Sequence, residues 1–150
     1  MRIISGKFKG LGLYAPKDKK IRPLKDMVRE SIFNFLIHSN KISFKLKGAN
    51  VLDLYSGVGS FGLECLSRYA NKITFVEKKR EAIEILKKNI NKINEKRNIR
   101  IFCNDVLSLI KKNNNNLEFN LIFCDPPFKD KNIEMLIELI FHKKLLKKNG

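Results

Sequence analysis

The chain has 150 residues and a formal net charge of +16 at pH 7, from 31 Lys and Arg against 15 Asp and Glu. The length predicts one domain, and the excess of cations predicts a polyanionic partner, most simply a nucleic acid. No run approaches the ~20 apolar residues of a membrane span, and the amino terminus lacks the apolar core of a signal peptide. We therefore expect a cytoplasmic protein, monomeric and without a membrane partner.

Three cysteines, Cys65, Cys103 and Cys124, lie far apart within apolar runs. They form no C-x-x-C pair, and no His-bearing metal spacing accompanies them. This pattern predicts buried, reduced thiols rather than disulfides or metal ligands. We expect no metal site.

The first 47 residues are basic and are interrupted by Gly and Pro. Apolar pieces at 3–4 and 11–14 predict a small β-hairpin. Helical spacing predicts a helix over 25–38, with Val28, Ile32 and Phe35 on one stripe. We interpret residues 1–47 as an extension that contacts nucleic acid, and residues 48–150 as the core. The cations predicted to grip phosphates are Arg22, Lys25, Arg29, Lys7 and Lys9.

From residue 50 onward, strand and helix patterns alternate. Strands are predicted at 50–54, 72–77, 99–103 and 119–124, and helices at 60–69, 79–95, 105–112 and 131–142. The alternation predicts an α/β, Rossmann-like fold: a doubly wound, mostly parallel sheet with helices on both faces. The strand at 119–124 would then be an unpaired sheet edge. We therefore expect either that the chain is a shortened version of a longer domain that lacks the last strands, or that another element covers this edge.

A Gly-rich turn (residues 55–59) follows the strand at 50–54. Glycines there allow positive φ and let the backbone approach a ligand at a helix N-terminus. Gly57, Gly59 and Gly62 satisfy the G-x-G-x-x-G dinucleotide pattern, which is weak evidence alone. Asp53 favours another ligand, because a carboxylate there repels a pyrophosphate but attracts an ammonium group such as that of S-adenosylmethionine (SAM). Glu77, ending the next apolar run, can accept two ribose hydroxyls of either cofactor.

The stretch Asp125-Pro126-Pro127-Phe128 directly follows the last predicted strand. Two successive prolines cannot continue a ladder, so the chain must break at the carboxyl end of the sheet, where ligands bind in such folds. The break displays a carboxylate, stiffened carbonyls and an aromatic ring. These groups suit a flat base that carries an amino group. The alternative is a structural turn in which Phe128 packs inward.

Together these motifs resemble those of class I SAM-dependent methyltransferases. The stretch from Asp53 to Gly59, which includes Tyr55 and Gly57, resembles their methionine-binding loop. In this comparison Glu77 is the ribose acid, and Asn104-Asp105 holds the acid that accepts the adenine amino group. Residues 125–128 match the Asn/Asp-Pro-Pro-Tyr/Phe signature of enzymes that methylate amino groups, which implies a catalytic role for Asp125, Pro126, Pro127 and Phe128.

A closer resemblance is to the RsmD-type methyltransferases that modify the guanine N2 amine of small-subunit (16S) ribosomal RNA. It rests on the basic stretch at residues 2–10, on Arg22-Pro23 and on Val28-Arg29-Glu30-Ser31-Ile32-Phe33-Asn34, although Leu24 replaces the usual Thr. It covers nearly the whole chain. The resemblance implies SAM as cofactor, and ribosomal RNA or a small-subunit assembly particle as partner.

Three other functions stay open at this point. The Asp-Pro-Pro-Phe motif also resembles that of DNA adenine-N6 methyltransferases, although 150 residues leave no room for their usual target-recognition domain. The chain could instead be an RNA-binding module that keeps the cofactor fold without activity. A dinucleotide oxidoreductase is disfavoured by Asp53.

Overall fold

The computed structural model describes residues 1–16, 24–39, 44–93, 95–112 and 117–150. Their centre is a parallel sheet in the order β3-β2-β1-β4. The strands are β1 (Asn50–Leu54), β2 (Lys72–Glu77), β3 (Ile99–Cys103) and β4 (Leu121–Cys124). The predicted parallel α/β sheet is confirmed, and only β4 begins later than the sequence pattern indicated.

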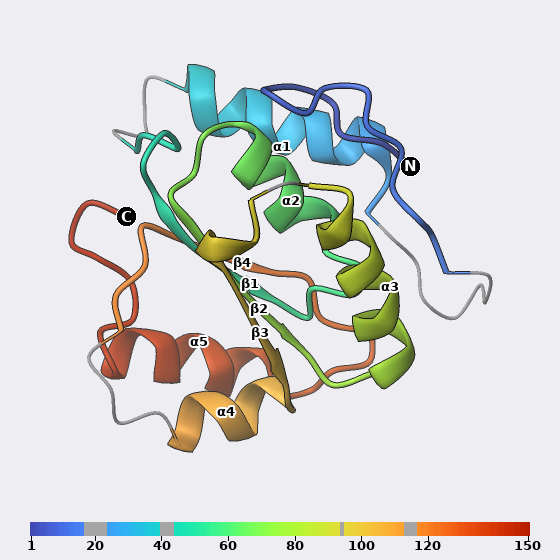
Figure 1. Cartoon of the computed structure of the whole chain (residues 1–150). Coiled ribbons are helices and arrows are strands. Elements are labelled where there is room, and N and C mark those ends of the chain that lie inside the picture. The colour runs from blue at the N-terminus through green and yellow to red at the C-terminus, as the bar shows by residue number, and fades with distance from the viewer. Residues whose placement is uncertain (17–23, 40–43, 94, 113–116) are drawn as a thin grey trace.

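Helices cover both faces of the sheet (Figure 1). On one face lie α1 (Asp26–His38), α2 (Ser60–Ser67) and α3 (Arg80–Asn91), and on the other α4 (Val106–Lys112) and α5 (Ile133–His142). A short 3₁₀ turn, η1 (Lys96–Asn98), leads into β3. The two-sided layering follows from the strand sequences, because successive side chains of a strand point to opposite faces.

Each face of the sheet therefore has its own apolar core. Val51 and Phe75 pack toward α1, α2 and α3, whereas Leu54 and Val76 pack toward α4 and α5. Burying one such side chain fully contributes about 1.5–3 kcal/mol. These strands are apolar on both faces, which is why they read as nearly continuous hydrophobic runs in the sequence.

The amino-terminal residues fold back on themselves as the predicted hairpin would, but they form no regular pair of strands in the part of the chain that the structure describes. The N–H of Ile3 donates to the Leu11 carbonyl at 2.9 Å, and a single antiparallel bridge joins Arg2 and Gly12. The predicted apolar stripe of α1 is wrong in part, because Val28 and Phe35 are exposed. The buried side chains of this helix include those of Arg29 and Phe33 instead.

Arg29 is completely buried, and its surroundings explain why. Its guanidinium donates to the Arg2 carbonyl and to Asp26, and its Nε lies 3.8 Å from the buried carboxylate of Glu64. Glu64 also accepts the N–H groups of Ile4 and Ser5. The prediction that Arg29 grips nucleic-acid phosphates is therefore wrong: it links the amino-terminal segment and α1 to α2.

β4 is an edge of the sheet over most of its length, as the sequence predicted. Within the described residues, the only pairing on its outer side is one parallel bridge between Phe119 and Leu146. Beside this edge lies a groove of about 600 Å³ whose apolar lining comes from β4, α5 and the chain end.

The cysteine prediction is correct only for Cys65, which is buried. Cys124 is half-buried, and Cys103 is exposed on the edge strand β3. Burial raises the pKa of the Cys65 thiol and that of the Cys124 thiol, the latter to about 11. All three are free thiols.

Candidate active site

Three strands of the sheet end side by side, and the candidate site lies where they end. Leu54, the last residue of β1, pairs with Val76 on one side and Cys124 on the other. The residues that follow these strands therefore meet at the end of the sheet formed by the carboxyl ends of its strands, which we call the carboxyl rim. Parallel topology makes this meeting obligatory, and such a rim is where ligands bind in open α/β sheets.

A small cavity of about 40 Å³ opens at this rim. It is lined by Leu24, Asp53, Tyr55, Ser56, Gly57, Val58, Ser60, Phe61, Phe123 and Asp125. The cavity thus joins the Gly-rich turn to the first residue of the Asp-Pro-Pro-Phe stretch. Its wall includes the rings of Phe61 and Phe123, which stack with centroids 3.7 Å apart.

Asp53 is the most deeply placed acid of the cavity, with 1% of its surface exposed. Its Oδ2 accepts the N–H of Gly62 at 2.9 Å. Burial raises the pKa of Asp53 to about 7, against the effect of the Gly62 hydrogen bond, and the nearby charges of Asp125 and Glu77 add to the rise. A bound cation would reverse this rise, because an opposite charge favours the ionised form.

The Gly-rich turn is held to the next strand by Glu77. One carboxylate oxygen of Glu77 accepts the N–H of Gly57 at 2.9 Å, and the other accepts that of Lys79 at 2.8 Å. A carboxylate can accept about four hydrogen bonds, so this one retains capacity for ligand hydroxyls. Gly57 has positive φ and open space where a Cβ would project, so a ligand can approach its backbone closely.

Gly59 and Gly62 are needed for packing rather than for access. A Cβ on Gly59 would collide with the side chain of Leu86, and one on Gly62 would collide with the ring of Phe75. The two glycines therefore let α2 lie close against β2 and α3. This is the role expected of glycines in close helix–strand packing.

Asn104 and Asp105 lie at the same rim, beside Glu77. The N–H of Asn104 donates to the Glu77 carbonyl at 3.0 Å. Asp105 caps the start of α4 by accepting the N–H of Ser108 at 3.0 Å. Both residues are exposed and lie outside the lining of the small cavity.

The Asp-Pro-Pro-Phe stretch leaves β4 as an exposed loop. Asp125, Pro127 and Phe128 are exposed, Pro126 is half-buried, and the ring of Phe128 is fully accessible. This arrangement contradicts the alternative in which Phe128 packs inward. Asp125 has no hydrogen-bond partner among the described residues, and partial desolvation raises its pKa.

A hydrogen bond ties this loop to the Gly-rich turn. The hydroxyl of Tyr55 donates to Asp130 Oδ2 at 2.9 Å. Tyr55 has a φ of 56°, unusual for a bulky residue, so the backbone of the turn is strained at this position. Hydrogen bonds from the backbone N–H of Asn132 and from Tyr55 lower the pKa of Asp130, and partial burial raises that of Tyr55.

The predicted phosphate-gripping cations do not gather in one place. Arg22 lies outside the described residues. Lys25 is exposed and directly follows Leu24, which lines the cavity. Lys7 instead lies at the far end of α2, where its N–H donates to the Ser67 carbonyl and its ammonium pairs with Glu95. Lys9 follows close by and is exposed.

Sequence reasoning missed several residues that shape the site. Asp130 was missed because a lone acid in a polar loop carries no signal, although it stands two residues beyond Phe128. Phe61 and Phe123 read as ordinary core residues, and only the fold shows that they line the cavity. Leu24 was noticed only as a departure from a family pattern.

Among the described residues, no group of three or more His, Cys, Asp or Glu side chains could hold a metal ion. No helix in these parts of the chain is both long and apolar enough to cross a membrane.

Comparison with known proteins agrees with this arrangement. The model of the family described as "Conserved hypothetical protein 95" matches residues 1–150. A protein of Buchnera aphidicola named ribosomal RNA small subunit methyltransferase D is 35% identical over the whole chain, which covers 72% of that relative. The Escherichia coli K12 protein of the same name is 34% identical over 93% of this chain and 66% of its own length.

Solved structures show the same fold. The yhhF protein of Escherichia coli superposes with a TM-score of 0.81 at 31% identity, over 98% of this chain and 75% of that one. The HI0767 protein of Haemophilus influenzae gives 0.74 at 32% identity, over 97% and 75%. The chain therefore belongs to the family described as "Conserved hypothetical protein 95", the RsmD family, and has a class I methyltransferase fold.

Proposed function

We propose that this chain transfers a methyl group from SAM to the exocyclic N2 amine of a guanine in small-subunit ribosomal RNA. The names of its relatives support ribosomal RNA as the substrate class. The observation that carries the proposal is the cavity in which Asp53, Gly57 and Asp125 meet. When bound, SAM supplies an activated methyl group on a positively charged sulfur, so the protein has mainly to position the two reactants.

The residues of the carboxyl rim fit this cofactor. Asp53 can pair its carboxylate with the ammonium of the methionine part, because within the described residues it accepts a single hydrogen bond, from Gly62. Gly57 offers open backbone for close approach. Glu77 keeps acceptor capacity for ribose hydroxyls, and Asn104 and Asp105 follow the next strand, where the adenine amino group would be accepted.

The cavity itself is too small to enclose a whole cofactor. Ligand pockets for molecules of that size measure about 300–1,000 Å³, against the 40 Å³ found here. The enclosed volume suits only the reacting end. The nucleoside would lie across the open rim toward Glu77 and Asp105.

The target amine is a weak nucleophile, because its lone pair is delocalised into the ring. Asp125 and the Pro126 carbonyl would accept its two hydrogens and stabilise the positive charge that develops on nitrogen. Holding both reactants in line can account for ~7–11 kcal/mol of the barrier. Phe128, which is fully exposed three residues beyond Asp125, would stack on the base, which typically contributes ~1–3 kcal/mol.

The RNA would approach this rim past the amino-terminal segment. Lys25, beside the cavity, and Arg22 are the cations proposed to hold phosphates there, and an unpaired loop would present the base at lower cost than a duplex. Lys7 and Lys9 are proposed to contact RNA farther away, at the other end of α2.

Methyl transfer from isotope-labelled SAM to small-subunit ribosomal RNA and to double-stranded DNA tests the proposal, with digestion and nucleoside mass spectrometry as the readout. The expected product is N2-methylguanine, from RNA only. N6-methyladenine as the sole product would overturn the guanine assignment and support the DNA alternative. No calorimetric binding at millimolar SAM would support the inactive RNA-binding module.

A further inference from the structure

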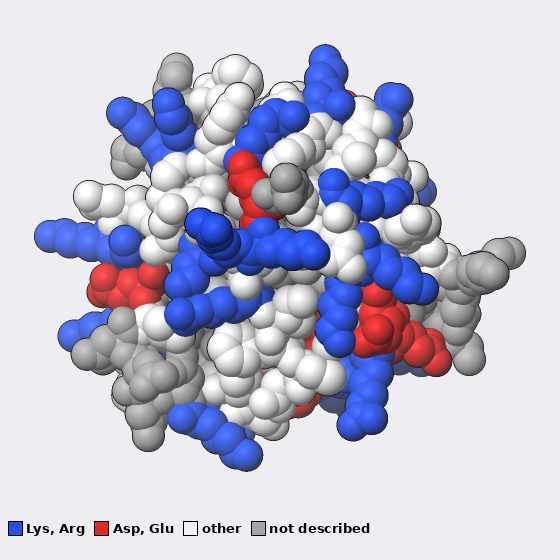
Figure 2. Space-filling model, in the orientation of Figure 1, with Lys and Arg blue, Asp and Glu red and all other residues white. Residues whose placement is uncertain are grey.

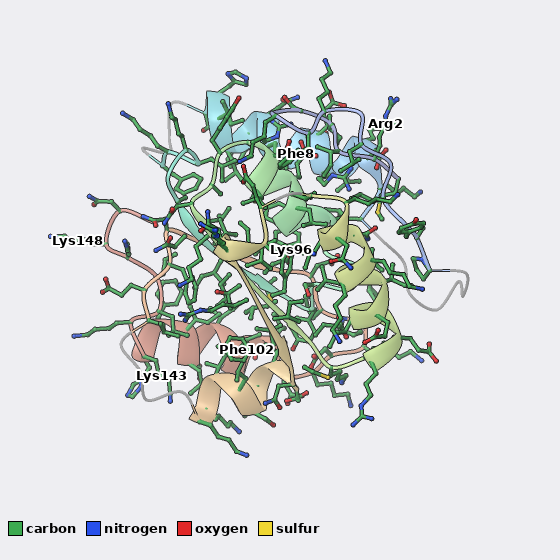
Figure 3. The ribbon with its side chains drawn as sticks, in the orientation of Figure 1. Arg2, Phe8, Lys96, Phe102, Lys143 and Lys148 are labelled. Atoms are coloured by element: carbon green, nitrogen blue, oxygen red, sulfur yellow. The ribbon has the colours of Figure 1, made fainter. Side chains whose placement is uncertain are left out.

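Lysine and arginine side chains cluster at the opposite end of the sheet, where the parallel strands begin. We call it the amino rim. Lys72 opens β2 opposite Asn50, and η1 leads into Ile99, which pairs with Ile73. Figure 2 shows blue Lys and Arg side chains near the centre of the view, where Figure 3 labels Lys96, and Figure 3 shows Lys148 projecting at the margin. The cations of the amino rim include Lys47, Lys72, Lys96, Arg97, Arg100 and Lys148.

These cations are not neutralised by the protein. None of the six forms an ion pair with a carboxylate in the part of the chain that the structure describes. Glu95, the acid nearest in sequence to η1, is already paired with Lys7. By contrast, the carboxyl rim carries Asp53, Glu77 and Asp125. The six cations therefore make a local excess of positive charge at the amino rim, which favours a polyanion there.

Tyr69 adds an aromatic ring to the same rim. It follows the end of α2, its carbonyl accepts the N–H of Gly48 at 2.8 Å, and Lys7 Nζ lies 5.8 Å from its ring centroid. Its φ is 70° and 54% of its surface is exposed. Glycine or asparagine usually occupies such a helix-ending position. A bulky residue held there in strain with its ring in solvent points to a binding role rather than a packing role.

We propose that the amino rim is a second RNA-docking surface, on which Lys96, Arg97, Arg100 and their neighbours hold phosphates while Tyr69 stacks on an unpaired base. Unpaired cations with an exposed ring are the combination that single-stranded RNA requires. A basic membrane-binding surface would not need the ring. This inference rests on the proposed RNA substrate and extends it.

The position of this surface restricts the substrate. The strands have four to six residues, so the two rims are roughly 13–20 Å apart. The base bound at the carboxyl rim therefore cannot itself touch the amino rim, which must be contacted by nucleotides several positions away or by another segment of the RNA. The preferred substrate is therefore a folded RNA, or an assembled particle, large enough to contact both ends of the sheet.

The test compares two triple variants that remove equal charge from the full chain. Lys96→Gln/Arg97→Gln/Arg100→Gln neutralises the amino rim, and Lys87→Gln/Lys88→Gln/Lys112→Gln is the matched control. Binding is measured by fluorescence anisotropy at several salt concentrations. The ligands are a folded small-subunit RNA fragment and a short oligonucleotide that carries only the target loop.

For the amino-rim variant we expect about tenfold weaker binding of the folded RNA. The slope of log K against log salt concentration should also become smaller in magnitude by roughly two to three, because each lost phosphate contact removes about 0.7–0.9 from it. The control variant should lose clearly less. Methylation of the short oligonucleotide and SAM affinity should stay at wild-type levels.

Tyr69→Gly gives an independent readout, because it removes the ring and the backbone strain together. It should raise the melting temperature and weaken binding of the folded RNA several-fold. Equal losses in both triple variants, or equal losses on the short oligonucleotide, would overturn the proposal. So would an amino-rim variant that binds the folded RNA like the wild type but no longer binds vesicles of anionic lipid, measured in parallel by co-sedimentation. Methylation that fails while the binding differences persist would instead count against the proposed reaction.

Discussion

Asp53→Asn should stabilise the protein while it destroys the cofactor site. Burial moves the pKa of this carboxyl from 3.8 to about 7. A raised pKa means that the folded state favours the neutral acid. The contribution of Asp53 to stability is therefore complete below pH 3.8 and is lost as the pH rises through about 7.

The size of this effect follows from the two pKa values. At 1.36 kcal/mol per pKa unit, ionising Asp53 in the free protein costs up to about 4 kcal/mol above pH 7. Asparagine avoids that cost and can still accept the N–H of Gly62. For a chain of this length, each kcal/mol corresponds to about 2–4 °C in melting temperature, so the variant should melt up to about 8–16 °C higher at pH 8 and about equally at pH 4.

SAM binding should change in the opposite direction. Removing one partner of a desolvated charge pair typically costs 2 kcal/mol or more, so affinity should fall at least about 30-fold. The wild-type protein should also bind SAM less tightly, and release more of its proton from Asp53 on binding, as the pH falls below 7. Calorimetry in buffers of different ionisation enthalpy measures both quantities.

Asp105→Asn is the matched control, since it changes an exposed carboxylate on the same rim and preserves the cap of α4. Its melting temperature should follow that of the wild type. The reasoning fails if Asp53→Asn melts at the wild-type temperature throughout pH 4–8, or if it keeps wild-type SAM affinity.

Three further variants test how the site is held together. Gly62→Ala places a methyl group against an aromatic ring, and this overpacking should lower the free energy of unfolding by about 1–3 kcal/mol in denaturant titration; an unchanged midpoint would contradict the packing described. Glu64→Gln removes the buried carboxylate that faces both Arg29 and Arg68, so that Arg29 keeps only Asp26 as a charge partner; this should cost about 3–5 kcal/mol, whereas a loss below 1 kcal/mol would mean that Asp26 or water compensates Arg29. Tyr55→Phe removes the hydrogen bond to Asp130 but keeps the ring that lines the cavity, so it should raise the KM for RNA more than it weakens SAM binding; equal effects on both ligands would refute this division.

The sequence predicted the sheet and most of the site for the same reason. Each strand is a short apolar run, and the residues that follow parallel strands must meet at one rim. Asp53, Gly57 and Asp125 therefore lie around one cavity although more than seventy positions separate the first from the last. The parallel topology is enough to predict that these residues lie together, and no side-chain contact has to be known in advance.

What the sequence could not predict depends on partners from distant elements. Arg29 looked like a surface cation, because nothing near it in sequence indicates that Glu64 of α2 lies buried beneath it. Cys103 looked buried until the strand order placed β3 at an edge. The role of Asp130 in holding the loop depends on the hydrogen bond from Tyr55, which lies 75 positions earlier in the sequence.

The most direct test of the central claim is to measure SAM binding and methyl transfer separately in the Asp125→Ala variant. The claim is that Asp125 acts on the target amine while Asp53 and the Gly-rich turn hold the cofactor. Calorimetric SAM affinity should stay within about twofold of wild type, while single-turnover methylation of small-subunit ribosomal RNA should fall below detection. Methyl transfer at the wild-type rate, or loss of SAM binding in parallel with activity, would contradict the account.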